Sequence, residues 1–140
     1  MPAALPPALA SVLADLLVAA HAGVVAFVVL GEAAFLLGGW RGWRWVHGLW
    51  LRLAHLALTG FIAAQTWLGE LCPLTLWEQA LRARAGEATY RGSFIGYWLD
   101  RLLYVDAPWW AFVVAYSAFL ALVALTWRWV PPRRAARTRW

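Results

Sequence analysis

The sequence predicts an all-α integral membrane protein, a helical bundle of three transmembrane helices with two short interfacial helices. Of its 140 residues, 64% are hydrophobic and only 14% are charged. Soluble domains are roughly 45–50% apolar, and a chain of this size could not hide the excess from water. The 12 tryptophans lie mostly near the ends of apolar runs, where indole rings collect at the headgroup level of a bilayer.

Three apolar segments are predicted to cross the membrane, at about residues 8–37, 45–69 and 108–130. The first follows two prolines that suit a helix start, and it is expected to end at Gly38 and Gly39. At 1.5 Å per residue it is longer than a ~30 Å hydrocarbon core, so it must tilt or protrude. A proline pair stops the last segment.

Two short helices are predicted between the second and third spans, at about residues 74–85 and 93–104. Thr75, with Glu78 three residues later, has the spacing of a capping box, and Ser93 is a candidate cap for the second helix. Both helices are amphipathic and too short to span a bilayer. We therefore expect them to lie along the membrane surface.

The basic side chains predict the topology. All 12 are arginines that flank apolar segments, which indicates topology signals rather than nucleic-acid contacts. With three spans in a single domain (residues 1–130), the loop after the first span and the basic tail (131–140) share one side. The positive-inside rule then places the N-terminus and residues 70–106 outside a bacterial inner membrane, with the C-terminus in the cytoplasm. A four-span alternative, with 92–104 crossing, separates the two basic regions. The arginines on the cytoplasmic side would be Arg41, Arg44, Arg52, Arg128, Arg133, Arg134, Arg137 and Arg139.

Ionisable residues inside the predicted spans are the first candidates for function. They are Asp15, His21, Glu32, Arg52 and His55. His21 and Glu32 share one face of the first helix, and Arg52 and His55 share a polar stripe of the second, so the two polar faces are expected to meet. The alternative is that Asp15 and Glu32 lie at the outer and inner headgroups while Arg52 snorkels to the inner surface.

The two histidines can face each other at similar depth if the helices are antiparallel. In that arrangement His21 and His55 can ligate haem b iron axially, bind a metal, relay protons or hydrogen-bond a quinone carbonyl. The alternative is that each hydrogen-bonds a backbone carbonyl or a hydroxyl and helps the helices associate. No residue spacing in the chain identifies a haem or metal site.

A third candidate group lies just past the second span and contains Cys72, Glu78 and Arg82. The lone thiol can be a nucleophile, a ligand or an acylation site, or it can be a small apolar residue before a proline at a helix corner. A single cysteine permits no internal disulfide. The sequence contains no Ser-His-Asp arrangement, phosphate-binding glycine loop or dinucleotide fingerprint.

The motifs also occur in a recognisable order. LADLLVAAHAGVVAFVVLGE is followed by HLAL in the second helix and then by CPLT..E..LR..AG...Y..SFI.Y. This order resembles the bacterial membrane family called domain of unknown function 2784, over about residues 12–127. The chain departs from the family's acidic residue in the outer half of the second helix, where it has Gln65 and Thr66. The resemblance implies no reaction, but it supports treating His21, His55 and the Cys72–Glu78 region as one site or structural unit. Further matching positions are Asp15, Phe27 and Gly31.

Three functional hypotheses follow from the sequence. The first is a non-catalytic accessory or structural subunit whose partners are the lipid bilayer and a larger membrane complex or a second copy of the chain, with no nucleic acid. The second is a redox or cofactor-binding module in which His21 and His55 are haem b ligands or a quinone site. The third is an envelope or lipid-modifying enzyme that uses the Cys72–Glu78 region.

Overall fold

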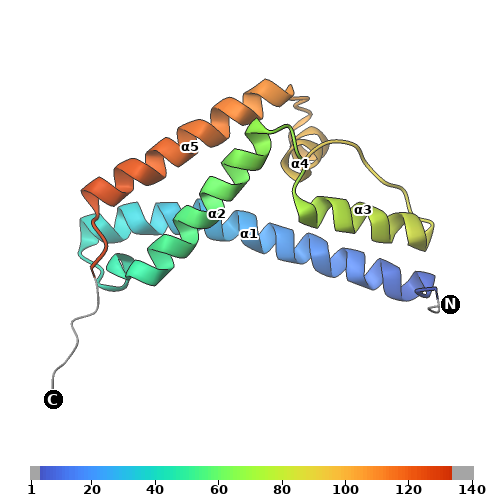
Figure 1. Ribbon diagram of the computed structural model, residues 1–140, viewed down its shortest axis with the longest axis horizontal. Helices are drawn as coiled ribbons and strands as arrows, with labels where there is room; N and C mark the ends of the chain where they lie inside the picture. The colour runs from blue at the N-terminus through green and yellow to red at the C-terminus, as the bar shows by residue number, and fades with distance from the viewer. Residues whose placement is uncertain (1–3, 134–140) are drawn as a thin grey trace, which may run out of the picture.

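A computed structural model describes residues 4–133 and confirms the all-α class (Figure 1). Five α-helices and one short 3-10 helix occur in the described chain. The only pairing of strand type there is an isolated bridge between Gly48 and Arg133. The elements are α1 (Pro7–Arg41), η1 (Trp45–His47), α2 (Leu49–Trp67), α3 (Pro73–Ala85), α4 (Phe94–Leu103) and α5 (Trp109–Trp129).

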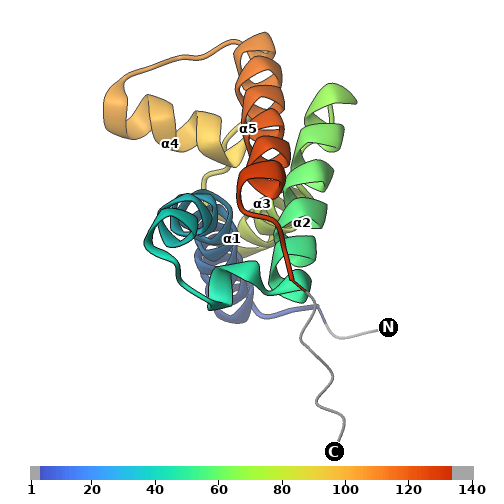
Figure 2. The same ribbon diagram turned by 90° about the vertical axis from the view of Figure 1, so that its left-hand side faces the viewer.

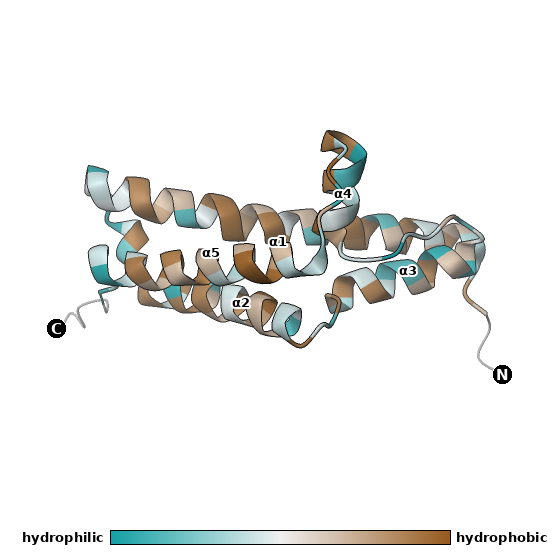
Figure 3. Ribbon diagram, turned by 90° about the horizontal axis from the view of Figure 1, so that it is seen from above, coloured by the Kyte–Doolittle hydropathy of each residue, from teal (hydrophilic) through white to brown (hydrophobic). Residues whose placement is uncertain are grey.

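The long helix α1 organises the molecule. Its N-terminal half packs along α3, and its C-terminal half packs beside the paired helices α2 and α5 (Figures 1 and 3). Toward the end that carries α3 and α4, α1 diverges from α2 and α5 (Figure 1). The short helix α4 projects to one side of the bundle, away from α2 (Figure 2). The fold is therefore a three-helix bundle with a cap, which we define as residues 73–103.

The helix α1 runs through both glycines that were expected to end it, so that prediction is wrong. Its C-cap is Gly42, which has the left-handed φ of 74° that glycine adopts without steric cost. Within the helix, a Cβ at Gly38 would overlap Val46, and a Cβ at Gly39 would overlap Val130. Tertiary packing therefore explains the glycine pair, because only hydrogen atoms leave room for these close approaches.

Two helices, α1 and α5, are long and apolar enough to cross a membrane. Only 17% of the residues in the apolar stretch of either helix are buried, unlike a helix in the core of a soluble protein. These two candidate spans indicate a membrane location. The predicted second span (45–69) does not meet the same measure, because Arg52, His55 and Gln65 make α2 less apolar.

The predicted second span also starts later than expected. It divides into η1 and α2 at Gly48, whose backbone is extended. At this end of the bundle, the amide of Arg133 donates to the carbonyl of His47 at 2.7 Å. A ring nitrogen of His47 lies 2.9 Å from the carbonyl of Pro131. These contacts hold the start of the tail against the loop after α1. Arg134, Arg137 and Arg139 of the predicted tail lie outside the described residues.

The two short helices of the cap form where they were predicted, but one of the two predicted N-cap residues, Thr75, is wrong. Helix α4 is capped by Ser93, whose hydroxyl accepts from the amide of Gly96 at 3.0 Å. Helix α3 starts at Pro73, two residues before Thr75, and has no side-chain cap. Proline is favoured in the first turn because its missing N–H would be unpaired there anyway. Thr75 is therefore inside the helix and buried.

Candidate functional site

The described chain contains two clusters of interacting polar residues, one toward each end of an apolar cavity. The cap cluster consists of Ser11, Asp15, Glu78, Arg82, Glu87 and Tyr90 and joins α1 to the cap. The loop-end cluster consists of Glu32, Arg52, His55 and Thr126 and joins α1, α2 and α5 near the end that carries η1.

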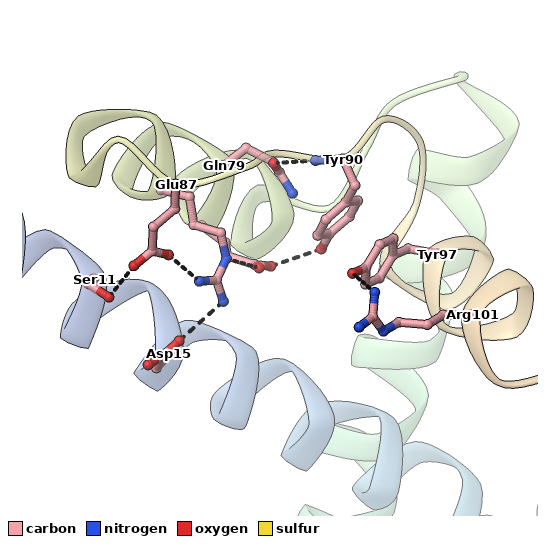
Figure 4. Close-up of polar contacts among 9 residues, drawn as sticks. Ser11, Asp15, Gln79, Glu87, Tyr90, Tyr97 and Arg101 are labelled. Atoms are coloured by element: carbon pink, nitrogen blue, oxygen red, sulfur yellow. Dashed lines mark hydrogen bonds and ion pairs between the residues drawn. The ribbon is translucent and has the colours of Figure 1, made fainter.

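Arg82 is the centre of the cap cluster, of which Figure 4 labels Ser11, Asp15, Glu87 and Tyr90. Its guanidinium binds three carboxylates from three parts of the chain. Nε donates to Glu78 at 2.9 Å, Nη1 to Glu87 at 2.8 Å and Nη2 to Asp15 at 3.2 Å. The hydrogen bond to Glu78, followed by the weaker bonds to Glu87 and Asp15, raises the pKa of Arg82. Arg82 is therefore charged, and all three of its guanidinium nitrogens are engaged in the contacts that link α1 and α3.

Glu78 is the buried partner of this network. Its side chain is only 3% exposed, and its second oxygen accepts from the hydroxyl of Tyr90 at 2.9 Å. Burial, reinforced by the Glu78 carboxylate, raises the pKa of Tyr90. A bond donated by Ser11, together with the bond from Arg82, lowers the pKa of Glu87. The shift at Glu87 favours the carboxylate that bonds to Ser11 of α1, and the shift at Tyr90 favours the hydroxyl that donates to Glu78 within the cap.

His21 lies next to this cluster and faces the cavity. Its imidazole stacks on Phe94 of α4, with ring centroids 4.0 Å apart and an angle of 19° between the planes. The residue is 7% exposed, and its Nδ1 has no hydrogen-bond partner among the described residues. The stacking contact fixes the ring and leaves a buried polar nitrogen available.

Arg52 dominates the loop-end cluster. It is 1% exposed and does not snorkel to a surface. Its Nη1 donates to the carbonyl of Val130 at 3.0 Å and lies 3.5 Å from that of Val46. The guanidinium lies over the ring of Phe35 at 4.6 Å and near that of Trp127 at 5.5 Å, so cation–π contacts replace part of its hydration. Arg52 thus ties α2 to η1 and to the end of α5.

His55 and Glu32 make the remaining contacts between helices in this cluster. A ring nitrogen of His55, Nε2, lies 2.8 Å from the carbonyl of Val28 in α1, as the alternative interpretation of this histidine expected. The Glu32 carboxylate is hydrogen-bonded to the hydroxyl of Thr126 in α5. Glu32 is 2% exposed, so it lies between helices and not at a headgroup surface. Both residues bind α1 to its neighbours.

The two histidines do not face each other. His55 is level with Val28 and Gly31 of α1, which is two to three turns from His21, or about 10–15 Å along the axis. His21 instead stacks on α4. This geometry does not direct two imidazoles at one iron or one quinone carbonyl, so the paired ligation gains no support from it. In residues 4–133 no group of three His, Cys, Asp or Glu side chains is close enough to hold a metal ion.

Cys72 occupies the N-cap position of α3 and lines the cavity. It is half-buried, and its neighbours in the wall include Leu71 and Leu74. This position agrees with a small apolar residue at a helix corner. Glu78 and Arg82 belong to the cap cluster, so the structure separates them in role from the thiol with which the sequence grouped them.

The cavity has a volume of about 520 Å³ and lies between α1, α2 and α5, under the start of α3 and α4. Its wall is almost wholly apolar and is built from side chains within residues 24–29, 58–66 and 109–119. The polar exceptions in the wall include His21, Gln65 and Glu70. Helix α1 diverges from the α2–α5 pair at this end of the bundle (Figure 1), and residues at the start of α3 and α4 complete the wall of the cavity.

Sequence reasoning missed several members of the site. Ser11, Glu87 and Thr126 were not identified, although a lone threonine in an apolar helix next to a buried acid was a usable signal for the last. Gln65 was noted only as a departure from a family pattern. Tyr90 was noted only as part of a family motif, and its bond to Glu78 depends on the return of the chain after α3.

The comparisons with known proteins give one match. The sequence model of the family described as "Protein of Unknown function (DUF2784)" matches residues 11–132. No curated protein and no solved structure matches the chain. The match covers most of the chain, including α2 to α5, all but the first four residues of α1, and both polar clusters.

Proposed function

The chain belongs to the DUF2784 family, and because that family has no known function we propose one from the geometry: a non-catalytic, three-span membrane protein that binds an apolar-chain lipid. The observation that carries this proposal is the cavity of about 520 Å³ between α1, α2 and α5. Its size falls within the ~300–1,000 Å³ range of small-molecule sites, which are mostly apolar with a few polar groups.

The length of α1 helps to locate one surface of the bilayer along this helix. Its 35 residues extend about 52 Å at 1.5 Å per residue, and a helix tilted by ~40° or less cannot fit that length within ~30 Å of hydrocarbon. Part of α1 must therefore leave the membrane. Asp15, whose side chain is 70% exposed, and the polar contacts to α3 mark the N-terminal part as the segment outside.

Helix α2 is proposed as the third crossing despite its lower hydropathy. Its polar side chains are turned inward: Arg52, His55 and Thr59 are 1–3% exposed. In contrast, the apolar side chains of Leu51, Leu53 and Trp67 are 37–68% exposed. A helix whose polar face is buried against neighbours presents only its apolar face to lipid, and this arrangement is typical of ionisable residues in membrane bundles.

Tryptophans support matching depths for α2 and α5. Trp50 and Trp67 are 17 residues apart in α2, as are Trp110 and Trp127 in α5, and 17 residues rise about 26 Å. Such pairs fit the two aromatic belts of a bilayer. The positive-inside rule favours the end with η1 as cytoplasmic and the cap as outside, which puts the cavity in the outer half of the membrane.

The polar side chains support a binding role rather than catalysis. Arg82, Arg52 and His55 each hold helices together, and the thiol of Cys72 lies in a largely apolar wall. A general acid or base must reach a reacting group, whereas these groups are engaged with their own chain. What the site offers a ligand is an apolar cavity, which suits a hydrocarbon chain.

A photo-crosslinking experiment tests the binding proposal. The protein in mild detergent is incubated with a diazirine-bearing hexadecanol, irradiated and digested, and labelled peptides are identified by mass spectrometry. We expect labelling of peptides from the cavity wall, and we expect Ala115→Trp, which fills the wall of α5, to abolish it. The matched Ala118→Trp lies on the same helix outside the wall and should label like the parent. Equal labelling of both variants would show that the probe does not enter the cavity.

The topology is tested separately at the single cysteine. A membrane-impermeant maleimide added to intact spheroplasts should label Cys72 if the cap is outside. Failure to label in spheroplasts, with normal labelling of denatured protein, would contradict the proposed orientation. The accessory-subunit role predicted from the sequence stays a prediction, which is tested by asking whether the chain migrates with a larger complex on a native gel.

A further inference from the structure

Two buried polar atoms in the otherwise apolar wall indicate which chemical group the ligand contains. His21 is 93% buried by its 7% exposure, and its Nδ1 has no partner among the described residues. Oε1 of Gln65 on α2 is also buried without a partner, and both residues line the cavity. A buried polar atom without a hydrogen bond is unfavourable, so a ligand that supplies the missing hydrogen bond gains more than its apolar contacts alone.

The positions of these two residues place the ligand's polar group. His21 belongs to α1 and is held by Phe94 at the floor of the cap, while Gln65 is two residues before the end of α2. Both lie at the cap end of the cavity. A molecule that bonds to them would therefore have its head beneath α3 and α4 and its chain directed toward the middle of the bundle.

The charged groups that line the cavity or form the cap cluster disfavour an anionic head. Glu70 is the carboxylate among the described lining residues, and that wall contains no arginine. The nearest guanidinium described in the cap cluster, Arg82, is bound on all three of its nitrogens by Asp15, Glu78 and Glu87. The other arginines of the cap, Arg84, Arg91 and Arg101, are exposed to solvent and do not line the cavity. Three carboxylates against one guanidinium leave the cap cluster negative, so it repels a carboxylate or phosphate and offers it no free cation.

We propose that the cavity selects an uncharged, single-chain lipid whose head carries a hydroxyl or a carbonyl group, bound by His21 and Gln65. This inference rests on the proposed lipid-binding function and adds the class of ligand. Imidazole and carboxamide groups each act as donor or acceptor, so one hydroxyl or carbonyl oxygen can pair with either. Long-chain alcohols, isoprenols and quinones share this chemistry, whereas fatty acids and phospholipids do not.

A matched pair of probes tests the selectivity. Diazirine-bearing hexadecanol and hexadecanoate have carbon chains of the same length, and at pH 8 the head is an uncharged hydroxyl in the first and a carboxylate in the second. We expect hexadecanol to label the cavity peptides of the parent protein at least about tenfold more efficiently. In His21→Leu and in Gln65→Leu the preference should fall several-fold, because each variant removes one hydrogen-bonding group. His21→Asn should restore part of it. His47→Leu, at the other end of the bundle, is the control and should behave like the parent.

The outcomes separate this inference from the function on which it rests. Equal labelling by the two probes, or stronger labelling by hexadecanoate, would overturn the inference about the head while leaving lipid binding in place. An unchanged preference in both His21→Leu and Gln65→Leu would also overturn it. If neither probe labels the cavity and Ala115→Trp changes nothing, the proposed function fails. Amide exchange of α3 checks that each variant keeps the cap docked, and Gln65→Leu still tests the inference if the histidine variants do not.

Discussion

Replacing Arg82 by methionine tests whether the cap is held on α1 by the cap cluster. The change keeps most of the stem of the side chain and removes the ion pairs to Glu78, Glu87 and Asp15. Glu78, 3% exposed, then keeps only the bond from Tyr90. Losing the partner of a buried charge costs about 3–5 kcal/mol, and because Arg82 itself is 18% exposed we take the lower figure. The other two carboxylates face solvent and add little.

A cost of about 3 kcal/mol predicts a local effect on the cap. At 1.36 kcal/mol per tenfold change, hydrogen–deuterium exchange of the α3 amides should become on the order of 100-fold faster, because those amides exchange when the cap opens. The amides of α5 should be unaffected. Arg84→Met is the control, since Arg84 is exposed on the same helix and makes no ion pair among the described residues. Equal exchange in Arg82→Met and Arg84→Met would refute the role of the cluster.

Three further changes test other contacts. Gly39→Ala places a methyl group against Val130 and should lower the melting temperature in detergent through overpacking of about 1–3 kcal/mol, whereas Gly23→Ala, in open space, should not lower it. Tyr90 has a raised pKa in the folded state, so its contribution to stability is full below pH ~10 and is lost as the pH rises further. Tyr90→Phe should remove this loss of stability, which thermal melts at pH 9–12 measure. An identical pH dependence of the melting temperature in both proteins would contradict the assignment. His55→Leu breaks the contact with an α1 carbonyl and should cost about 1–2 kcal/mol, measured by the melting temperature; an unchanged value would show that the contact is not stabilising.

Local sequence signals predicted the helices well. Ser93 and the proline before α5 define the starts of α4 and α5 within one residue, because each acts on its own first turn. The end of α1 could not be predicted in this way. Gly38 and Gly39 break isolated helices, but here the approach of Val46 and Val130 decides the backbone, and those residues come later in the chain.

The candidate site was predicted less completely than the fold. Helical periodicity correctly indicated polar faces on α1 and α2, because the angle between residues on one helix follows from sequence spacing. It could not give their partners. The expectation that the two histidines lie at similar depth assumes that the first two helices overlap along their length, whereas α1 runs past α2 and pairs there with α3. The neighbour of His21 is therefore Phe94 of the cap and not His55.

The separation of the two polar clusters explains how a bundle with so small a buried core can keep an apolar cavity. The cap cluster meets α1 at Asp15 and the loop-end cluster meets it at Glu32, 17 residues or about 26 Å apart. Each end is fastened by its own arginine, so the apolar middle does not have to close on itself. Sites this far apart without shared partners act additively to within about 0.5 kcal/mol. The effects of Arg82→Met and Arg52→Met on stability should therefore add, and a larger coupling would mean that the helices around the cavity transmit strain between the two ends.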